Sequence, residues 1–161
     1  MNVLRFWPPL ARLSLGVGGV TDFSAPSVLI VEDEQSIRDV LVELFEVRGT
    51  RVDSAATLDA AKAVLADRAF DLIVTDIRLG GRRDGGLQVM AAAGVLSPEA
   101  MVIALTAYPD DANRHASLRL GATHFLEKPV SLETIAELAT AAGVPTALTP
   151  PVHEAPSART S

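Results

Sequence analysis

Short apolar runs recur along the middle of the chain and predict the strands of a parallel sheet. Four of them read "VLIV" (28–31), "DLIVTD" (71–76), "MVIALT" (101–106) and "THFL" (123–126). They do not alternate polar with apolar positions, which is typical of strands buried on both faces of a sheet. A weaker extended segment, "TRVDSA" (50–55), fits a fifth strand nearer an edge of the sheet.

Between these runs, apolar residues recur at helical spacing and predict helices. Such stripes run through 37–45, 58–65, 112–120 and 132–139, and Gly49 and Gly121 follow the first and third as stop signals. The stretch 86–95 is less regular and fits a short helix with a frayed end. A strand followed by a helix, five times over, predicts a doubly wound α/β domain at about residues 27–142. It would hold a five-stranded parallel sheet with helices on both faces, and the pattern alone leaves the strand order open.

The two ends of the chain differ in composition from the middle. Residues 1–26 hold neither the apolar stretch of roughly 7–15 residues that a secretory signal needs nor the ~20 of a membrane span. We therefore expect a disordered N-terminal extension there. Residues 143–161 are rich in Pro, Ser and Thr and are expected to be a disordered tail. Because fewer residues follow position 142 than the ~50 of a small domain, a free-standing domain without an attached output is expected.

Charge and cysteine content narrow the classes of function. Of the 161 residues, 48% are apolar, as a folded core requires, and the formal net charge is −6, with lysine only at positions 62 and 128. That balance argues against a nucleic-acid partner, which needs a basic stripe. The sequence contains no cysteine, which excludes disulfides and cysteine-based metal or redox chemistry. The lack of cysteine is compatible with a reducing compartment, and we expect a cytoplasmic protein. It is expected to bind no nucleic acid and, because no sufficiently long apolar run exists, no membrane.

The predicted strands end in side chains that can act together. In a doubly wound sheet, sites form beyond the carboxyl ends of the strands. In chain order, the side chains delivered there are Glu32, Asp33, Glu34, Asp76, Thr106 and Lys128, the last followed by Pro129. Clustered carboxylates repel one another unless a cation lies between them, and their hard oxygens favour Mg²⁺. A magnesium ion opposite an ammonium group predicts a phosphoryl site, with Asp76 as the nucleophilic carboxylate that accepts the group.

The motifs that carry these residues, "VEDE", "VTDIRL", "LTAY" and "GATHFLEKPV", resemble the receiver domain of two-component response regulators. The resemblance covers about residues 27–142, and the intervals between the motifs also match the family. It implies the flavodoxin-like (βα)5 fold and phosphorylation of Asp76 by a histidine kinase or a phosphotransfer protein. Beyond gaining this phosphoryl group and losing it by hydrolysis, no enzymatic activity is implied. Output would pass to an unknown protein on the surface of the fourth helix, fifth strand and fifth helix, and a phosphorylation-linked homodimer is a further option.

The resemblance also implies roles for residues around the acceptor. Asp33 and Asp76 are expected to bind Mg²⁺ directly, and Glu32 is expected to help through a water molecule. The backbone carbonyl of Arg78 would complete the ligands that the protein supplies. Lys128 is expected to pair with Asp76 and then with the phosphoryl oxygens.

A second group of residues is expected to form the switch. Thr106 would swing inward to hydrogen-bond the phosphoryl group, and Phe125 would turn inward as the threonine moves. Pro129 is expected to follow a cis peptide bond. Tyr108 and Arg78 are candidates for controlling the access of water to the acyl phosphate. The alternatives are that Phe125 is only a core aromatic and Tyr108 only a half-exposed ring.

Two features depart from the pattern of the family. The family commonly has a proline four residues after the acceptor, where this chain has Gly80, and the loop "LGGRRDGG" is about one residue longer than usual. Its glycines permit backbone conformations that other residues avoid. The neighbouring pair Arg82 and Arg83 is interpreted mainly as solvated charge. We expect altered loop geometry and altered kinase or phosphatase preference, with phosphorylation retained.

Other functions stay open at this point. A pseudo-receiver would be an interaction module that never carries phosphate; the altered loop favours it, whereas the intact acids, threonine and lysine argue against it. A Mg²⁺-dependent phosphatase with an aspartate nucleophile usually has a second acid two residues after that aspartate, where this chain has Arg78. A flavin-binding protein of similar architecture would need a phosphate-cradling loop after the first strand, and "EDEQS" would repel that phosphate.

Overall fold

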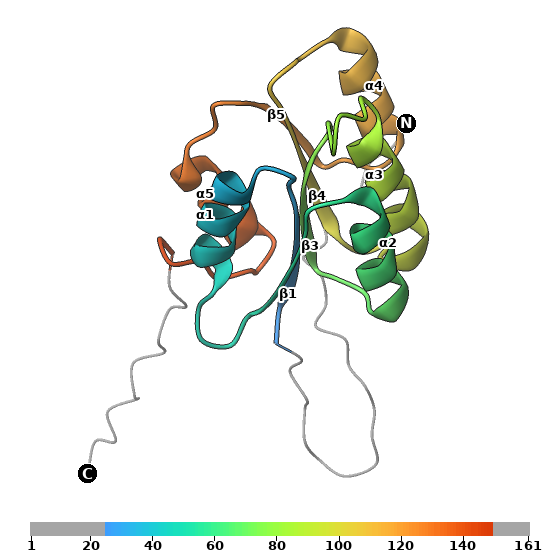
Figure 1. Ribbon diagram of the computed structural model, residues 1–161. Coiled ribbons are helices and arrows are strands. Elements are labelled where there is room, and N and C mark those ends of the chain that lie inside the picture. Colours follow the sequence, from blue (N-terminus) through green and yellow to red (C-terminus); the bar gives the residue numbers. More distant parts are fainter. Residues whose placement is uncertain (1–24, 150–161) are drawn as a thin grey trace, which may run out of the picture.

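Strands and helices alternate along residues 25–149, the part of the chain that the computed structural model describes (Figure 1). The strands are β1 (Ser27–Val31), β2 (Arg51–Ala55), β3 (Leu72–Asp76), β4 (Met101–Thr106) and β5 (His124–Glu127). The helices are α1 (Gln35–Phe45), α2 (Leu58–Asp67), α3 (Gly85–Leu96), α4 (Asp111–Arg119) and α5 (Leu132–Ala141). The doubly wound α/β fold expected from the apolar pattern is therefore confirmed.

The strands form one parallel sheet in the order β2-β1-β3-β4-β5. Strands β1, β3 and β4 lie in the middle and are almost entirely buried, as their continuous apolar runs predict. The prediction that 50–55 lies near an edge is confirmed, since β2 is an edge strand. Strand β5 differs from its prediction, because it forms the opposite edge and its residues are only half-buried or exposed.

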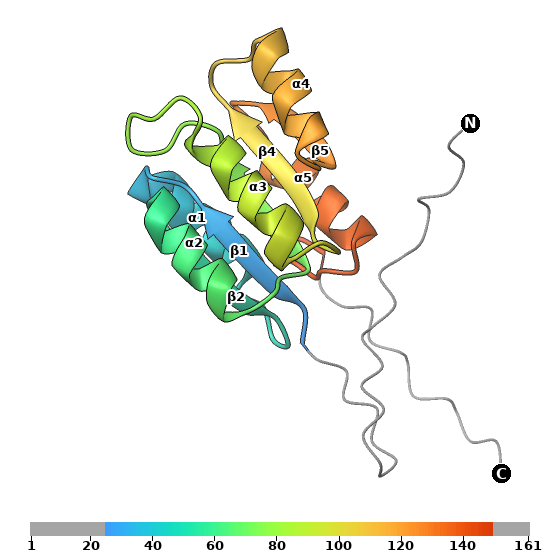
Figure 2. The same cartoon turned by 90° about the vertical axis from the view of Figure 1, so that its right-hand side faces the viewer.

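Successive side chains of the central strands feed two separate apolar cores. Leu29 and Ile73 pack in the core beneath α2 and α3, whereas Val28 and Leu72 pack in the core beneath α1 and α5. This alternation follows from the two-residue period of a strand. Figure 1 shows α1 and α5 on one side of the sheet and α2, α3 and α4 on the other, and Figure 2 shows α3 and α4 on either side of β4. Burial on both faces holds the central strands, and therefore their carboxyl ends, in fixed positions.

Two helices differ in their bounds from the sequence pattern. Helix α1 ends at Phe45, before the expected stop at Gly49, which instead has φ +86° in the turn that leads to β2. Helix α3 is a regular helix of 12 residues rather than a short frayed one. Its buried Val89 and Met90 pack against the α2 side of the core, so tertiary packing stabilises a helix that its own periodicity signals weakly.

The packed part of the chain extends past residue 142, where the sequence led us to expect a disordered tail. Val144 and Thr146 are buried, and the Ala147 N–H donates a 2.8 Å hydrogen bond to the carbonyl of Leu44 at the end of α1. Residues 150–161 of the expected tail and residues 1–24 of the expected extension lie outside the described residues. Within 25–149, no helix combines the length and the apolar character needed to cross a membrane.

Candidate functional site

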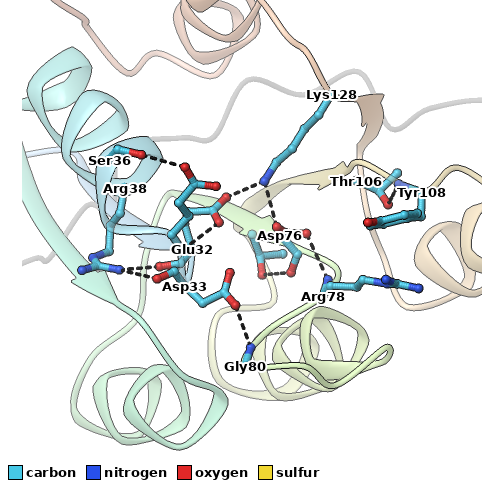
Figure 3. Close-up of polar contacts among 12 residues, drawn as sticks. Glu32, Asp33, Ser36, Arg38, Asp76, Arg78, Gly80, Thr106, Tyr108 and Lys128 are labelled. Atoms are coloured by element: carbon cyan, nitrogen blue, oxygen red, sulfur yellow. Dashed lines mark hydrogen bonds and ion pairs between the residues drawn. The ribbon is translucent and has the colours of Figure 1, made fainter.

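The carboxyl ends of neighbouring strands bring the predicted acids together. Asp76 is the last residue of β3, and Glu32 and Asp33 directly follow β1, the strand hydrogen-bonded to β3. One oxygen from each of these three carboxylates lies within 4.8 Å of the others (Figure 3). The sequence placed these groups at one edge of the sheet, and the strand order makes them immediate neighbours. Glu34 does not join them, because its carboxylate faces Ser36 and accepts a 2.8 Å hydrogen bond from the serine hydroxyl.

Lys128 enters the cluster from the loop that follows β5. Its Nζ donates hydrogen bonds to Asp76 Oδ2 at 2.8 Å and to Glu32 Oε2 at 2.7 Å (Figure 3). The pairing with Asp76 was predicted, whereas the pairing with Glu32 was not. The peptide bond between Lys128 and Pro129 is cis. The ammonium group therefore bridges carboxylates at the carboxyl ends of two different strands, β1 and β3.

Burial sets the electrostatics of this bridge. Glu32 is 1% exposed, and this burial raises its pKa above the usual range, partly opposed by the hydrogen bond and charge of Lys128. Burial alone would lower the pKa of Lys128, but the hydrogen bonds and charges of Asp76 and Glu32 outweigh it, so that its pKa is raised. The lysine consequently keeps its proton at neutral pH.

The cluster has the composition of a site for a hard divalent cation. Lys128 pairs with two of the three clustered carboxylates, those of Glu32 and Asp76, so negative charge is in excess. Asp33 is exposed to solvent, which leaves a path for an ion to enter. Only oxygen ligands are present among these three residues, which suits Mg²⁺ or Ca²⁺ and not Zn²⁺. The residues present therefore fit a divalent metal ion.

Two further contacts hold the acidic loop after β1, and sequence reasoning missed both. Arg38 Nη1, from α1, donates hydrogen bonds to the backbone carbonyls of Glu32 at 2.8 Å and Asp33 at 3.3 Å. The Gly80 N–H, from the loop after β3, donates a 2.9 Å hydrogen bond to Asp33 Oδ2 (Figure 3). An arginine one turn into the helix that follows the acids was a usable signal for the first contact. Nothing in the sequence signals the second, since it joins residues 47 positions apart.

The predicted switch residue Thr106 and the predicted gating residues Arg78 and Tyr108 lie together on one side of Asp76 (Figure 3). Thr106 is fully buried, and its Oγ1 accepts a 3.0 Å hydrogen bond from the backbone N–H of Tyr108. The Arg78 guanidinium lies over the Tyr108 ring, 3.9 Å from its centre, while the Arg78 backbone N–H donates to Asp76 Oδ1 at 3.0 Å. Figure 3 shows this stacked pair beside Asp76, on the side opposite to Asp33.

Phe125 lies in the edge strand β5, which β4 separates from the acceptor strand β3. It is half-buried and packs against the core on the α2 and α3 side of the sheet. The Arg114 guanidinium, from α4, lies 4.8 Å from the centre of the Phe125 ring and 3.6 Å from Glu127 Oε1. One arginine thus contacts both Phe125 and the last residue of β5, an arrangement that sequence reasoning did not predict.

A glycine at the start of α3 allows the backbone of the acceptor to be approached closely. A Cβ atom on Gly86 would overlap the carbonyl oxygen of Asp76 and lie 2.6 Å from the Cα of Ile77. The Gly86 N–H donates a 2.8 Å hydrogen bond to the Ile77 carbonyl, which fixes the first turn of α3 against the end of β3. The start of α3 therefore packs directly against the backbone of Asp76 and Ile77 and helps to hold the acceptor in place.

Comparisons with known proteins agree with this geometry. The sequence profile of the response regulator receiver domain family matches residues 28–140. The photosynthetic apparatus regulatory protein RegA of Rhodobacter capsulatus is 36% identical over 133 residues, which are 82% of this chain and 70% of RegA. The chain therefore belongs to the response regulator receiver domain family, whose members take phosphoryl groups from histidine kinases. The resemblance inferred from the motifs is confirmed.

Solved structures of similar proteins have the same fold. A CheY-like receiver domain from Methanospirillum hungatei is 30% identical with a TM-score of 0.67, and the match covers 73% of this chain and 92% of that one. A response regulator from Burkholderia pseudomallei, solved with a phosphorylated aspartic acid, a calcium ion and citrate, is 30% identical with a TM-score of 0.64. That match covers 71% of this chain and 65% of the other. Some curated relatives are longer, and the chain spans 59% and 40% of two of them.

Proposed function

We propose that this chain accepts a phosphoryl group on Asp76 from a histidine kinase or a phosphotransfer protein, in a reaction that requires Mg²⁺. The 2.8 Å contact between Lys128 Nζ and Asp76 Oδ2, inside a cluster of acids, is the observation that carries the proposal. Family membership supports it, as does the phosphorylated aspartic acid in the Burkholderia relative. The product is a signalling state of the protein and not a released small molecule.

In the proposed transfer, one carboxylate oxygen of Asp76 forms a bond to the phosphorus of the donor's phosphohistidine. The phosphorus–nitrogen bond breaks, and the imidazole leaves with the electron pair and takes a proton from solvent. Asp33 and Asp76 would hold Mg²⁺ together with the Arg78 carbonyl and, through water, Glu32. Such an ion would offset the negative charge of the acids and of the incoming phosphoryl oxygens. Lys128, which now contacts Asp76 Oδ2, would then contact the phosphoryl oxygens of the resulting acyl phosphate.

We further propose that Thr106 and Phe125 convert the phosphoryl group into a change of surface. The Thr106 hydroxyl accepts a hydrogen bond from the Tyr108 N–H in this structure. After phosphorylation it would turn and donate a hydrogen bond to a phosphoryl oxygen instead. That movement frees space toward which Phe125 can turn, which shifts an existing equilibrium between two conformations. The face of α4, β5 and α5 would then present a different surface to an output protein or to a second copy of this chain.

The stack of Arg78 on Tyr108 suits control of dephosphorylation. Hydrolysis of an acyl phosphate requires a water molecule in line with the phosphorus–oxygen bond. Arg78 lies two residues after Asp76, and its guanidinium lies 3.9 Å from the ring centre of Tyr108, beside the acceptor. We propose that this pair restricts the approach of water and so prolongs the phosphorylated state.

Mass spectrometry of the intact protein tests the proposal. After incubation with Mg²⁺ and acetyl phosphate, we expect one added phosphoryl group, which is absent from an Asp76→Asn variant and present in the control Asp59→Asn, on the exposed part of α2. Omission of Mg²⁺ should abolish the gain. If neither acetyl phosphate nor any histidine kinase phosphorylates the protein, the pseudo-receiver is the better interpretation. Turnover of a phosphorylated small molecule that depends on Asp76 would instead indicate a phosphatase.

A further inference from the structure

The loop between β3 and α3, where this chain departs from the family pattern, forms a tight turn. The Leu79 N–H donates to the Arg82 carbonyl at 3.1 Å, and the Arg82 N–H donates to the Leu79 carbonyl at 3.0 Å. Between them Gly80 and Gly81 have φ angles of +57° and +78°. These are the features of a two-residue type I′ turn, in which both central residues have positive φ. Figure 2 shows this loop extending beyond the body of the domain.

Proline, the common family residue at this position, is incompatible with the turn for two reasons. Its ring fixes φ near −65°, far from the +57° of Gly80, and it has no backbone N–H. In this chain that N–H has a specific partner, because it donates the 2.9 Å hydrogen bond to Asp33 Oδ2. The glycine therefore provides a contact that a proline at this position could not make.

Asp33 is the member of the acidic cluster that depends most on such a contact. Glu32 and Asp76 are buried and paired with Lys128, whereas Asp33 is exposed. The Asp33 backbone is held by Arg38 of α1, which donates a hydrogen bond to the Asp33 carbonyl. Without the Gly80 hydrogen bond, the Asp33 side chain could adopt several rotamers. The Gly80 hydrogen bond occupies Oδ2 and leaves the other oxygen, Oδ1, for a metal ion.

We propose that the β3–α3 turn is a positioning element for the metal ligand Asp33, acting through the N–H of Gly80. The inference rests on the proposed magnesium site. A hydrogen bond to a ligating carboxylate fixes its orientation before the ion arrives, and loss of such a partner typically weakens metal binding by 10–100-fold. Because binding free energies are reciprocal, a metal ion on Asp33 also stabilises the turn that carries Arg82. The metal site and this protruding turn are thus coupled.

Calorimetric titration of the full chain with Mg²⁺ alone tests the proposal without any phosphorylation. Gly80→Pro removes the donor, and we expect the dissociation constant for Mg²⁺ to rise about 10-fold, the low end of the range because Asp33 is exposed. Gly80→Asn keeps the N–H, and asparagine tolerates positive φ, so its affinity should stay near that of the parent chain. Equal or tighter binding by Gly80→Pro, or the same loss in both variants, would overturn the proposal.

Nuclear magnetic resonance separates a direct contact from a general effect on the fold. The amide signal of Gly80 should move with added Mg²⁺ along the same binding curve as the calorimetric heat. The amide of Gly81, in the same turn and also at positive φ, is the matched control and should move much less. If both amides move equally, or neither moves while Mg²⁺ binds, the turn does not act through Gly80. If the parent chain shows no saturable Mg²⁺ binding at all, the proposed function itself fails.

Discussion

Replacement of Lys128 by methionine should destabilise the fold strongly, although the side chain lies at a functional site and not in an apolar core. The ammonium group is the partner of two carboxylates, Glu32 and Asp76, whose side chains are 2% and 11% exposed. Methionine has a similar length and no charge, so the change removes the cation with little loss of packing. Both acids would then remain in a poorly solvated position without the group that compensates them.

The expected magnitude follows from the burial of these groups. Removal of one partner from a buried ion pair typically costs about 3–5 kcal/mol, because the other charge is left uncompensated. The Lys128 side chain is 17% exposed, so solvent reaches the cluster and the low end applies. We expect a loss of about 3 kcal/mol in the free energy of unfolding at neutral pH, which corresponds to a fall in Tm of roughly 10 °C for a domain of this size.

The loss should depend on pH in a defined direction. The pKa of Glu32 is already raised by burial, and it rises further when the lysine that opposes this shift is removed. A carboxyl group with a raised pKa penalises the folded state once pH exceeds the value in the unfolded chain, and the penalty grows until pH passes the folded value. In the parent chain Lys128, whose pKa is raised, stays charged from acid to neutral pH. The difference between parent and variant should therefore be smallest in acid and largest at neutral pH.

Urea unfolding followed by circular dichroism, at several values between pH 5 and 8, measures this loss. The chain contains one other lysine, Lys62, which is exposed on α2 with its Nζ 3.5 Å from Gln88 Oε1, so Lys62→Met is a matched control. The control should change stability by less than about 0.5 kcal/mol. Equal effects of the two substitutions, or a Lys128→Met effect that is constant across this pH range, would refute the reasoning.

Two further predictions concern α3 and the lifetime of the phosphorylated state. Gly86→Ala should cost about 3 kcal/mol in unfolding free energy, because its Cβ would overlap the backbone at the end of the acceptor strand. Gly94→Ala on the same helix should instead stabilise by about 0.5–1 kcal/mol, because its Cβ would meet only the Leu120 carbonyl oxygen, at 4.0 Å; thermal unfolding of both variants measures the difference. Tyr108→Ala should hasten loss of the phosphoryl group about two- to five-fold, the worth of an exposed cation–π contact. Arg78→Ala should hasten dephosphorylation by the same factor, and the double variant should be no faster than either single variant. A double variant in which the two factors multiply would contradict a shared role.

Much of this protein could be inferred from its sequence because the relevant signals are local. Continuous apolar runs such as 28–31 and 71–76 identify buried parallel strands, because the pattern of apolar residues within a short segment indicates its secondary structure. The position of Asp76, at the end of such a run, then indicates the edge at which a site forms. The length of α3 was not predicted correctly, because its apolar residues are spread around the helix and give no clear stripe. Its regularity comes from packing against α2.

The contacts that shape the site are not local, and only the tertiary structure decided them. The placement of β1 beside β3 makes Glu32 a second partner of Lys128, although 96 positions separate the two residues in the chain. The contact of Gly80 with Asp33 likewise depends on a turn with positive φ and on how two loops meet at the edge of the sheet. Residue types and their spacing therefore determined the fold and the kind of chemistry. Which donor faces which carboxylate depends on distances between separate elements, and those distances are set by packing of the whole domain.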